Sequence, residues 1–140
     1  MLHRRPDKRI MPDVWMGPGG KREFNEGLFE ATRREVLEET GLHIKNLRIK
    51  VAGNAYVEDL EQEFFFHFVF ADYESGEVHQ HPEDGELVWL TPEEILSLDN
   101  ILAEIRELGP ALFEDDGRVL SYSALYGKGN SLKSFQLEQP

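Results

Sequence analysis

The spacing of apolar and polar positions predicts one long helix in the first third of the chain. From Leu28 the pattern is helical, and it ends at Gly41, where glycine suits the left-handed residue that closes many helices. On a helical wheel Glu35, Glu38 and Glu39 fall within an arc of roughly 100°. We therefore expect three carboxylates to project from one side of this helix.

Two segments after this helix have the composition of strands. Residues 47–57 and 63–72 are rich in β-branched or aromatic residues and are bounded by polar turns. Side chains of the second segment alternate between two faces, and both faces are largely apolar. One of these faces carries Phe64, Phe66, Phe68 and Phe70. We expect this strand to lie at the centre of a sheet that is covered on both sides.

Shorter elements are predicted towards the C-terminus. A strand is expected at residues 86–90, after an acidic loop. Thr91-Pro92-Glu93-Glu94 is typical of a capping box with proline at the first helical position, and it predicts a short helix to about Leu98. We also expect a helix over 101–108, a hairpin over 111–122 that turns at 115–117, and a loosely held tail from about residue 128.

Composition and charge limit the classes of function. The chain has 140 residues, no cysteine and a formal net charge of −12. The lack of cysteine excludes disulfides and thiolate metal ligands. The negative charge argues against long nucleic acids and anionic membranes as partners. With no signal peptide and no apolar run of membrane length, we expect a soluble, cytoplasmic protein.

The charge is distributed unevenly along the chain. Residues 1–34 carry eight Lys and Arg against five Asp and Glu, a net charge of +3, so the remainder carries −15. Solvated surface charges that are unevenly distributed by chance would explain this asymmetry. It also fits a basic segment that faces an anionic ligand, which the rest of the protein would repel.

A longer pattern surrounds the three carboxylates. Taken alone, the acidic run is typical of a solvated helix with neighbouring arginines. However, Gly20 is followed after five residues by Glu26 and after seven more by Arg34-Glu35-Val36-Leu37-Glu38-Glu39-Thr40-Gly41-Leu42. This 23-residue pattern has the form of the Nudix box. The chain therefore resembles the Nudix (MutT-like) hydrolase family.

The resemblance implies a fold. Members of the family have an α+β fold, an α/β/α sandwich with a mixed sheet between helices, and we expect a single domain over residues 1–140. Met1–Arg5 looks like the end of the strand that precedes the catalytic loop. The usual first strand of the family is therefore expected to be missing from this chain. Asn25 stands where a glycine is common, and asparagine tolerates the left-handed conformation that this turn needs.

The resemblance also implies a cofactor and roles for the box residues. The family hydrolyses nucleoside diphosphates linked to another group, with Mg²⁺ or Mn²⁺, which prefer hard oxygen ligands. It assigns the metal to Glu35, Glu38 and Glu39, with the carbonyl of Gly20 as a further ligand. The resemblance makes Glu38, Glu35 and Arg34 the expected catalytic residues of the box. Arg34 is expected to pair with a carboxylate such as Glu26 and so to hold the ligands in place.

Substrate contacts are expected outside the box helix. Lys21 and Arg4 are candidates for binding phosphate, and Trp15 is a candidate for stacking on a base, with a place in the core as the alternative. Asp84 and Glu86 belong to an acidic segment similar to one near the family's active site. Either of them, or a box carboxylate, can serve as the base that activates water.

Three functions remain open at this point. Trp15-Met16-Gly17-Pro18-Gly19-Gly20-Lys21 is similar to the Trp-x-Gly-x-Gly-Gly-Lys segment of members that hydrolyse nucleoside triphosphates, which favours release of pyrophosphate from such a substrate, oxidised or otherwise non-standard nucleotides included. ADP-ribose or a dinucleotide is the second substrate class. A nucleotide-binding sensor without turnover is the third function. We expect a small nucleotide as the partner and leave a homodimer open.

Overall fold

The computed structural model describes residues 1–139 and divides into two compact units. The first unit consists of residues 1–48 and 71–102, and the second of residues 49–70 together with the chain from 103 onwards. Two long strands, β3 (His43–Val57) and β4 (Gln62–Ser75), belong in part to each unit. Both cover the segments predicted as strands and extend beyond them.

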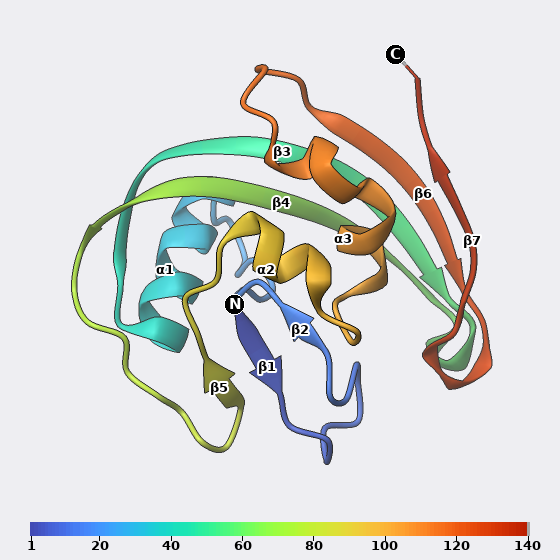
Figure 1. Ribbon diagram of the computed structural model, residues 1–140, viewed down its shortest axis with the longest axis horizontal. Helices are drawn as coiled ribbons and strands as arrows, with labels where there is room; N and C mark the ends of the chain where they lie inside the picture. Colours follow the sequence, from blue (N-terminus) through green and yellow to red (C-terminus); the bar gives the residue numbers. More distant parts are fainter. Residues whose placement is uncertain (140) are drawn as a thin grey trace. The chain divides into compact units, whose positions relative to one another are not determined.

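The first unit contains a small antiparallel sheet. It is made of β1 (Leu2–Arg4), β2 (Trp15–Met16) and β5 (Gly85–Leu87), in the order β2-β1-β5 (Figure 1). Leu2 is buried and lies opposite Met16 on one side and Leu87 on the other. The strand β5 is thus confirmed, although it is shorter than predicted.

Two helices of the first unit begin and end where the sequence predicts. The helix α1 (Leu28–Thr40) closes at Gly41, which has a φ of 78° and donates its N–H to the carbonyl of Leu37 over 2.9 Å. The helix α2 (Pro92–Ser97) starts with the predicted capping box: the Thr91 hydroxyl accepts the Glu94 N–H over 3.2 Å, and the Glu94 carboxylate accepts the Thr91 N–H over 2.7 Å. No helix within residues 1–139 is long and apolar enough to cross a membrane.

The second unit is built on a mixed sheet. Its strands β6 (Leu120–Tyr126) and β7 (Leu132–Leu137) pair antiparallel, and β6 pairs parallel with β3, so that the strand order is β4-β3-β6-β7. The helix α3 (Ala103–Leu108) and three 3-10 helices (Glu58–Leu60, Gly109–Phe113 and Lys128–Asn130) complete it. Val51, Tyr122 and Tyr126 are its most fully buried large side chains.

Three predictions for the strands and the tail were wrong. The strand β4 lies at an edge of its sheet, and Phe65 is 76% exposed there, because apolar residues on both faces do not by themselves determine strand order. No hairpin forms over 111–122: a 3-10 helix ends at Phe113, and β6 pairs with the distant strand β3 instead. The tail is ordered as β7, because it pairs with β6 and its Phe135 stacks on Tyr122 at 5.0 Å.

Candidate active site

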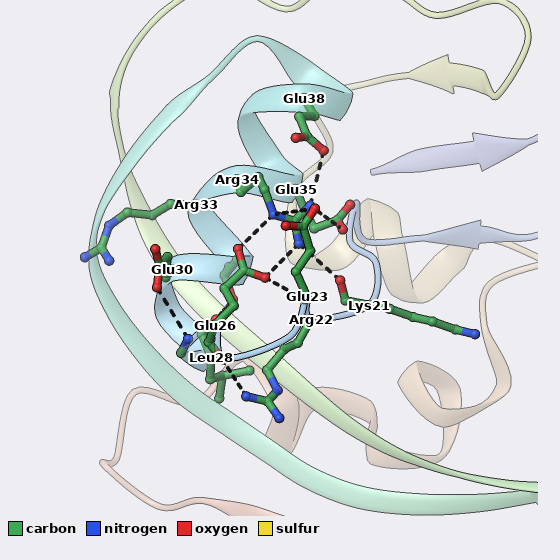
Figure 2. Close-up of polar contacts among 12 residues, drawn as sticks. Lys21, Arg22, Glu23, Glu26, Leu28, Glu30, Arg33, Arg34, Glu35 and Glu38 are labelled. Carbon is green, nitrogen blue, oxygen red and sulfur yellow. Dashed lines mark hydrogen bonds and ion pairs between the residues drawn. The ribbon is translucent and has the colours of Figure 1, made fainter.

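Arg34 lies at the centre of a group of carboxylates in the first unit (Figure 2). Its guanidinium donates to both oxygens of Glu26, Nε to Oε1 over 2.8 Å and Nη2 to Oε2 over 2.9 Å. The same side chain donates from Nη1 to Glu35 over 2.8 Å and to Glu38 over 3.3 Å. The neighbouring Arg33 points away from the group. The expected pairing of Arg34 with Glu26 is confirmed. Arg34 also reaches Glu35 and Glu38, which are two of the expected metal ligands.

The pair of Arg34 and Glu26 is withdrawn from solvent. The Glu26 side chain is 9% exposed. Hydrogen bonds from Arg34, and then from the backbone N–H of Glu23, lower the pKa of Glu26 from 4.5 to about 2. Hydrogen bonds with Glu26 and Glu35 in turn raise the pKa of Arg34. Because the two-pronged pair joins the loop before α1 to the helix itself, it fixes where the helix presents its carboxylates.

The glycine loop, residues 17–20, is packed directly against α1, which we call the box helix. A Cβ atom placed on Gly20 would lie 2.4 Å from the Glu35 carboxylate, so only glycine fits here without moving that side chain. One position earlier, the backbone N–H of Gly19 donates to Glu39 over 2.8 Å. Two of the three expected metal ligands are therefore in contact with the loop that carries Gly20, whose carbonyl is itself an expected metal ligand.

Glu39 connects this helix to the acidic segment before β5. Burial is the main cause of its raised pKa, and the charges of Glu35 and Asp84 raise it further, whereas the Gly19 N–H and the charge of Arg4 lower it. A small cavity beside Glu39 is lined by Leu2, His81, Asp84, Gly85 and Leu87. Glu39 thus lies close enough to Glu35 and Asp84 for their charges to act on it, and we call Glu35, Glu38, Glu39 and Asp84 the acidic cluster.

The donor set suits a hard divalent cation. Glu35, Glu38 and Glu39 each make their polar contact through one carboxylate oxygen, which leaves the second oxygen of each for a cation. Within residues 1–139, no three Asp, Glu, His or Cys side chains are already placed to hold a metal ion. The chemistry of the residues fits Mg²⁺ or Mn²⁺, and binding would draw the carboxylates together.

Comparison with known proteins gives the family. Residues 1–112, which include the box helix and its loop, match the model of the NUDIX domain. The chain belongs to the Nudix family. Its fold agrees: it is similar to the crystal structure of a mutator MutT protein from Bacillus halodurans, with a TM-score of 0.79, 27% identity and coverage of 99% of this chain and 89% of that one.

Curated relatives share parts of this Nudix chain. An uncharacterized Nudix hydrolase, YvcI of Bacillus subtilis, is 33% identical over 88 residues, which is 60% of this chain and 55% of YvcI. The m7GpppN-mRNA hydrolase NUDT17 of Xenopus laevis is 40% identical over 53 residues, 38% of this chain and 18% of that protein. The chain thus spans about half the length of YvcI and less of NUDT17.

The structure brings two of the candidate substrate residues, Asp84 and Arg4, to the acidic cluster. Asp84 lines the cavity beside Glu39, and its carboxylate accepts from Lys8 over 2.9 Å. Arg4 lies near enough to lower the pKa of Glu39, while its guanidinium donates to the carbonyls of Ile10 and Met11. These bonds hold Arg4 against the loop that follows β1.

The other candidates are placed differently. Lys21 points its side chain away from the carboxylates, and only its carbonyl joins the group, by accepting from Arg34 over 3.1 Å (Figure 2). Trp15 stacks on His3 with ring centroids 4.4 Å apart, so one face of its indole is covered. Glu86 is exposed on β5, opposite His3.

Sequence reasoning missed three features of this site. It counted Lys8 within the basic N-terminal segment without giving it a partner, and Lys8 pairs with Asp84. It gave no role to His81 in the acidic loop before β5, and His81 lines the cavity beside Glu39. It considered only the carbonyls of the glycine loop and not the N–H of Gly19. The excess of basic residues in the N-terminal segment was the one available signal, and it did not specify a residue. The left-handed turn at Asn25, with a φ of 61°, is as expected.

Proposed function

We propose that the protein is a Mg²⁺-dependent hydrolase that cleaves a nucleoside triphosphate to a nucleoside monophosphate and pyrophosphate. The observation that carries the proposal is the complete Nudix box, with Arg34 bound to Glu26, Glu35 and Glu38 and the glycine loop in contact with Glu35 and Glu39. The similarity of the loop to that of nucleoside triphosphate hydrolases supports this substrate class. The likeness of the fold to MutT supports hydrolysis of a diphosphate linkage in general.

Each box residue has a part in the proposed reaction. Glu35, Glu38, Glu39 and the Gly20 carbonyl would hold Mg²⁺, which when bound neutralises phosphate charge and makes a water more acidic. Glu38 is the favoured group to orient the attacking water and accept its proton, because its side chain is 59% exposed and makes one long contact of 3.3 Å. Arg34 acts as a positioning residue.

The bond changes follow from this arrangement. The water oxygen forms a bond to phosphorus, the bond from phosphorus to the bridging oxygen breaks in line with it, and pyrophosphate leaves with that oxygen. The proton of the water passes to the carboxylate that orients it. The basic residues near the cluster, Arg4 and Lys8, reduce the repulsion between the acidic cluster and the phosphates.

A second substrate class has its own support. The relatives from Xenopus laevis and Danio rerio are named m7GpppN-mRNA hydrolases, and such a substrate carries a nucleotide at both ends of its phosphate chain. A dinucleotide or ADP-ribose is therefore the alternative for this chain. The two classes differ in products, because only the first releases pyrophosphate.

Turnover of a substrate panel separates the candidates. Purified protein with Mg²⁺ is assayed on nucleoside triphosphates, oxidised variants, ADP-ribose and a capped dinucleotide, with the products identified by chromatography. We expect the highest kcat/KM for a nucleoside triphosphate and loss of activity with a chelator. Turnover of ADP-ribose or the dinucleotide alone would replace the first substrate class by the second. Nucleotide binding without any turnover by folded protein would support a sensor instead.

A further inference from the structure

One edge of the sheet in the second unit is open to another strand. In the order β4-β3-β6-β7, the strand β4 has a neighbouring strand on one side only among residues 1–139, and its segment 62–70 belongs to the second unit. A free edge presents unpaired backbone N–H and C=O groups, which proteins usually protect with a charged residue or a proline. Residues 64–71 contain no Lys, Arg, Asp, Glu or Pro. This edge therefore lacks the usual protection against pairing with another chain.

The opposite edge of the same sheet is protected. The strand β7 forms this edge and carries Lys133 (Figure 1). The Lys133 ammonium donates to both carboxylate oxygens of Glu58, each over 2.9 Å. A lysine on an edge strand disfavours pairing with a further strand. Of the two edges within the described residues, β4 is thus the one suited to an added strand.

Aromatic side chains are exposed on both faces of β4. Phe65 is 76% exposed on one face, and Phe66 is 39% exposed on the other. Phe66 stacks on Phe64 with ring centroids 5.9 Å apart, and on the same face the Phe70 ring lies 6.1 Å from that of Phe113. A partner packed on one face of the sheet would cover only one of the two exposed rings. A strand beside β4 would cover both, because adjacent strands pair their side chains on each face.

The charge of the protein favours a second copy as the source of this strand. The formal net charge of −12 makes two copies repel each other, and an uncharged stretch is where they can approach most closely. An antiparallel pair of β4 strands centred on Phe66 satisfies this condition. Glu63 is the only residue of 62–70 with a formal charge, and it would lie opposite Val69 of the second copy. No two carboxylates of these segments would then face each other.

We propose that two copies of this chain pair through the edges of their β4 strands, antiparallel and centred on Phe66, and so join their sheets into one. In this register Phe64 lies opposite Phe68 of the second copy on one face, and Phe65 lies opposite His67 on the other. The interface includes no residue of the acidic cluster, so it does not depend on the proposed hydrolase function. Because a single pair of strands makes a small interface, we expect a dissociation constant in the micromolar range.

Sedimentation velocity of the full chain, over a range of protein and salt concentrations, tests the proposal. We expect a monomer–dimer equilibrium that shifts towards the dimer as salt screens the repulsion between copies. Phe65→Lys places a charge on the edge and should weaken the dimer by roughly tenfold or more. Its melting temperature should not change, because this ring is exposed. The matched control is Val119→Lys, at an exposed apolar residue of the second unit outside β4, which should dimerise like the wild type.

Crosslinking tests the register of the pair. The wild type has no cysteine, so Phe66→Cys introduces a single thiol into each chain. In the proposed pairing the two residues 66 face each other with Cα atoms about 4.5–5.5 Å apart, which is within the reach of a disulfide. Mild oxidation should therefore convert this variant to a covalent dimer much faster than Val119→Cys.

Each outcome bears on the proposed interface or on the proposed function. A monomer at every protein and salt concentration, or equal crosslinking of the two cysteine variants, would overturn the interface. A folded Phe65→Lys protein that dimerises like the wild type would also overturn it, because the contact would then lie elsewhere. Pairing through β4 in a protein that hydrolyses no nucleotide would retain the interface and remove the proposed function.

Discussion

The two units each withdraw a glutamate from solvent, and they treat it in opposite ways. Glu26 of the first unit meets the guanidinium of Arg34 with both oxygens, and its pKa falls to about 2. Glu104 of the second unit is 2% exposed and accepts a hydrogen bond from the Tyr126 hydroxyl over 2.6 Å. Burial is the main cause of its raised pKa.

The difference shows what each carboxylate contributes. A carboxylate paired with a cation stays charged and fixed in position, which a site for metal and phosphate requires. A buried carboxylate without a cation favours its neutral form and destabilises the fold when it is charged. The second unit adds another uncompensated polar group beside it, since the buried Tyr122 hydroxyl has no hydrogen-bond partner among residues 1–139. The ion pair of the first unit thus positions the residues of the candidate site, whereas the buried carboxylate of the second unit lowers the stability of the fold when it is charged.

The largest expected effect is loss of catalysis on removing one charge from the acidic cluster. We expect Glu38→Gln to lower kcat by about 10²–10⁴-fold, the usual range for a group that transfers a proton. The melting temperature should stay unchanged or rise, because repulsion within the cluster falls. Steady-state kinetics and thermal unfolding measure the two effects.

Glu30→Gln is the matched control for this variant. Glu30 lies on the same helix and accepts the N–H of Gly27, a contact that glutamine can keep. The Glu30→Gln variant should therefore retain the kcat of the wild type. Wild-type kcat in Glu38→Gln would remove the catalytic role assigned to this residue.

Breaking the central pair should have the next largest effect. Arg34→Gln leaves Glu26 without its cation and releases Glu35 and Glu38, so we expect kcat or Mg²⁺ affinity to fall by about 10–100-fold. The melting temperature should fall as well. Because the Glu26 pKa is lowered from 4.5 to about 2, the pair stabilises the fold fully above pH 4.5, and this contribution is lost as the pH falls towards 2.

The adjacent arginine supplies the control. Arg33 points away from the carboxylates, so Arg33→Gln should change neither kcat nor the acid unfolding curve. If both variants behave alike, or if the stability gap between Arg34→Gln and the wild type persists at pH 2, the pairing with Glu26 is not what holds the site.

The box helix could be predicted from the sequence, and much of its surroundings could not. Its limits, its acidic face and the pairing of Arg34 depend on residues close in the sequence, where helical spacing and Gly41 act locally. The edge position of β4 and the parallel pairing of β6 with β3 depend on contacts across more than 60 residues, which no local pattern encodes. The pair of Lys8 and Asp84 was missed for the same reason.

A smaller effect is expected from filling the space at Gly20. The added Cβ of Gly20→Ala would meet the Glu35 carboxylate, which must shift from its present position beside Arg34. We expect a loss of kcat of about tenfold, because small displacements of a reacting group are costly, with little change in stability. Gly17→Ala is the control, since a Cβ there meets no atom within 4 Å. Equal kinetics for the two variants would contradict the proposed fit of the loop.

The smallest effect is expected in the second unit, and it concerns stability alone. Glu104→Gln removes a buried charge and keeps an oxygen for the Tyr126 hydroxyl. Because the folded pKa of Glu104 is raised above 4.5, stability of the wild type is unaffected below that pH and declines as the pH rises through the raised value. The variant should therefore be more stable at neutral pH, by on the order of 1 kcal/mol, and indistinguishable at pH 4.

Denaturant unfolding across this pH range tests the idea against Glu107→Gln, at an exposed position of the same helix. Glu107→Gln should follow the wild type at every pH, and both variants should keep full kcat because neither touches the acidic cluster. Equal stability of Glu104→Gln and the wild type at neutral pH would mean that the buried carboxylate costs nothing. The contrast drawn between Glu26, which is paired with a cation, and Glu104, which is not, would then be wrong for Glu104.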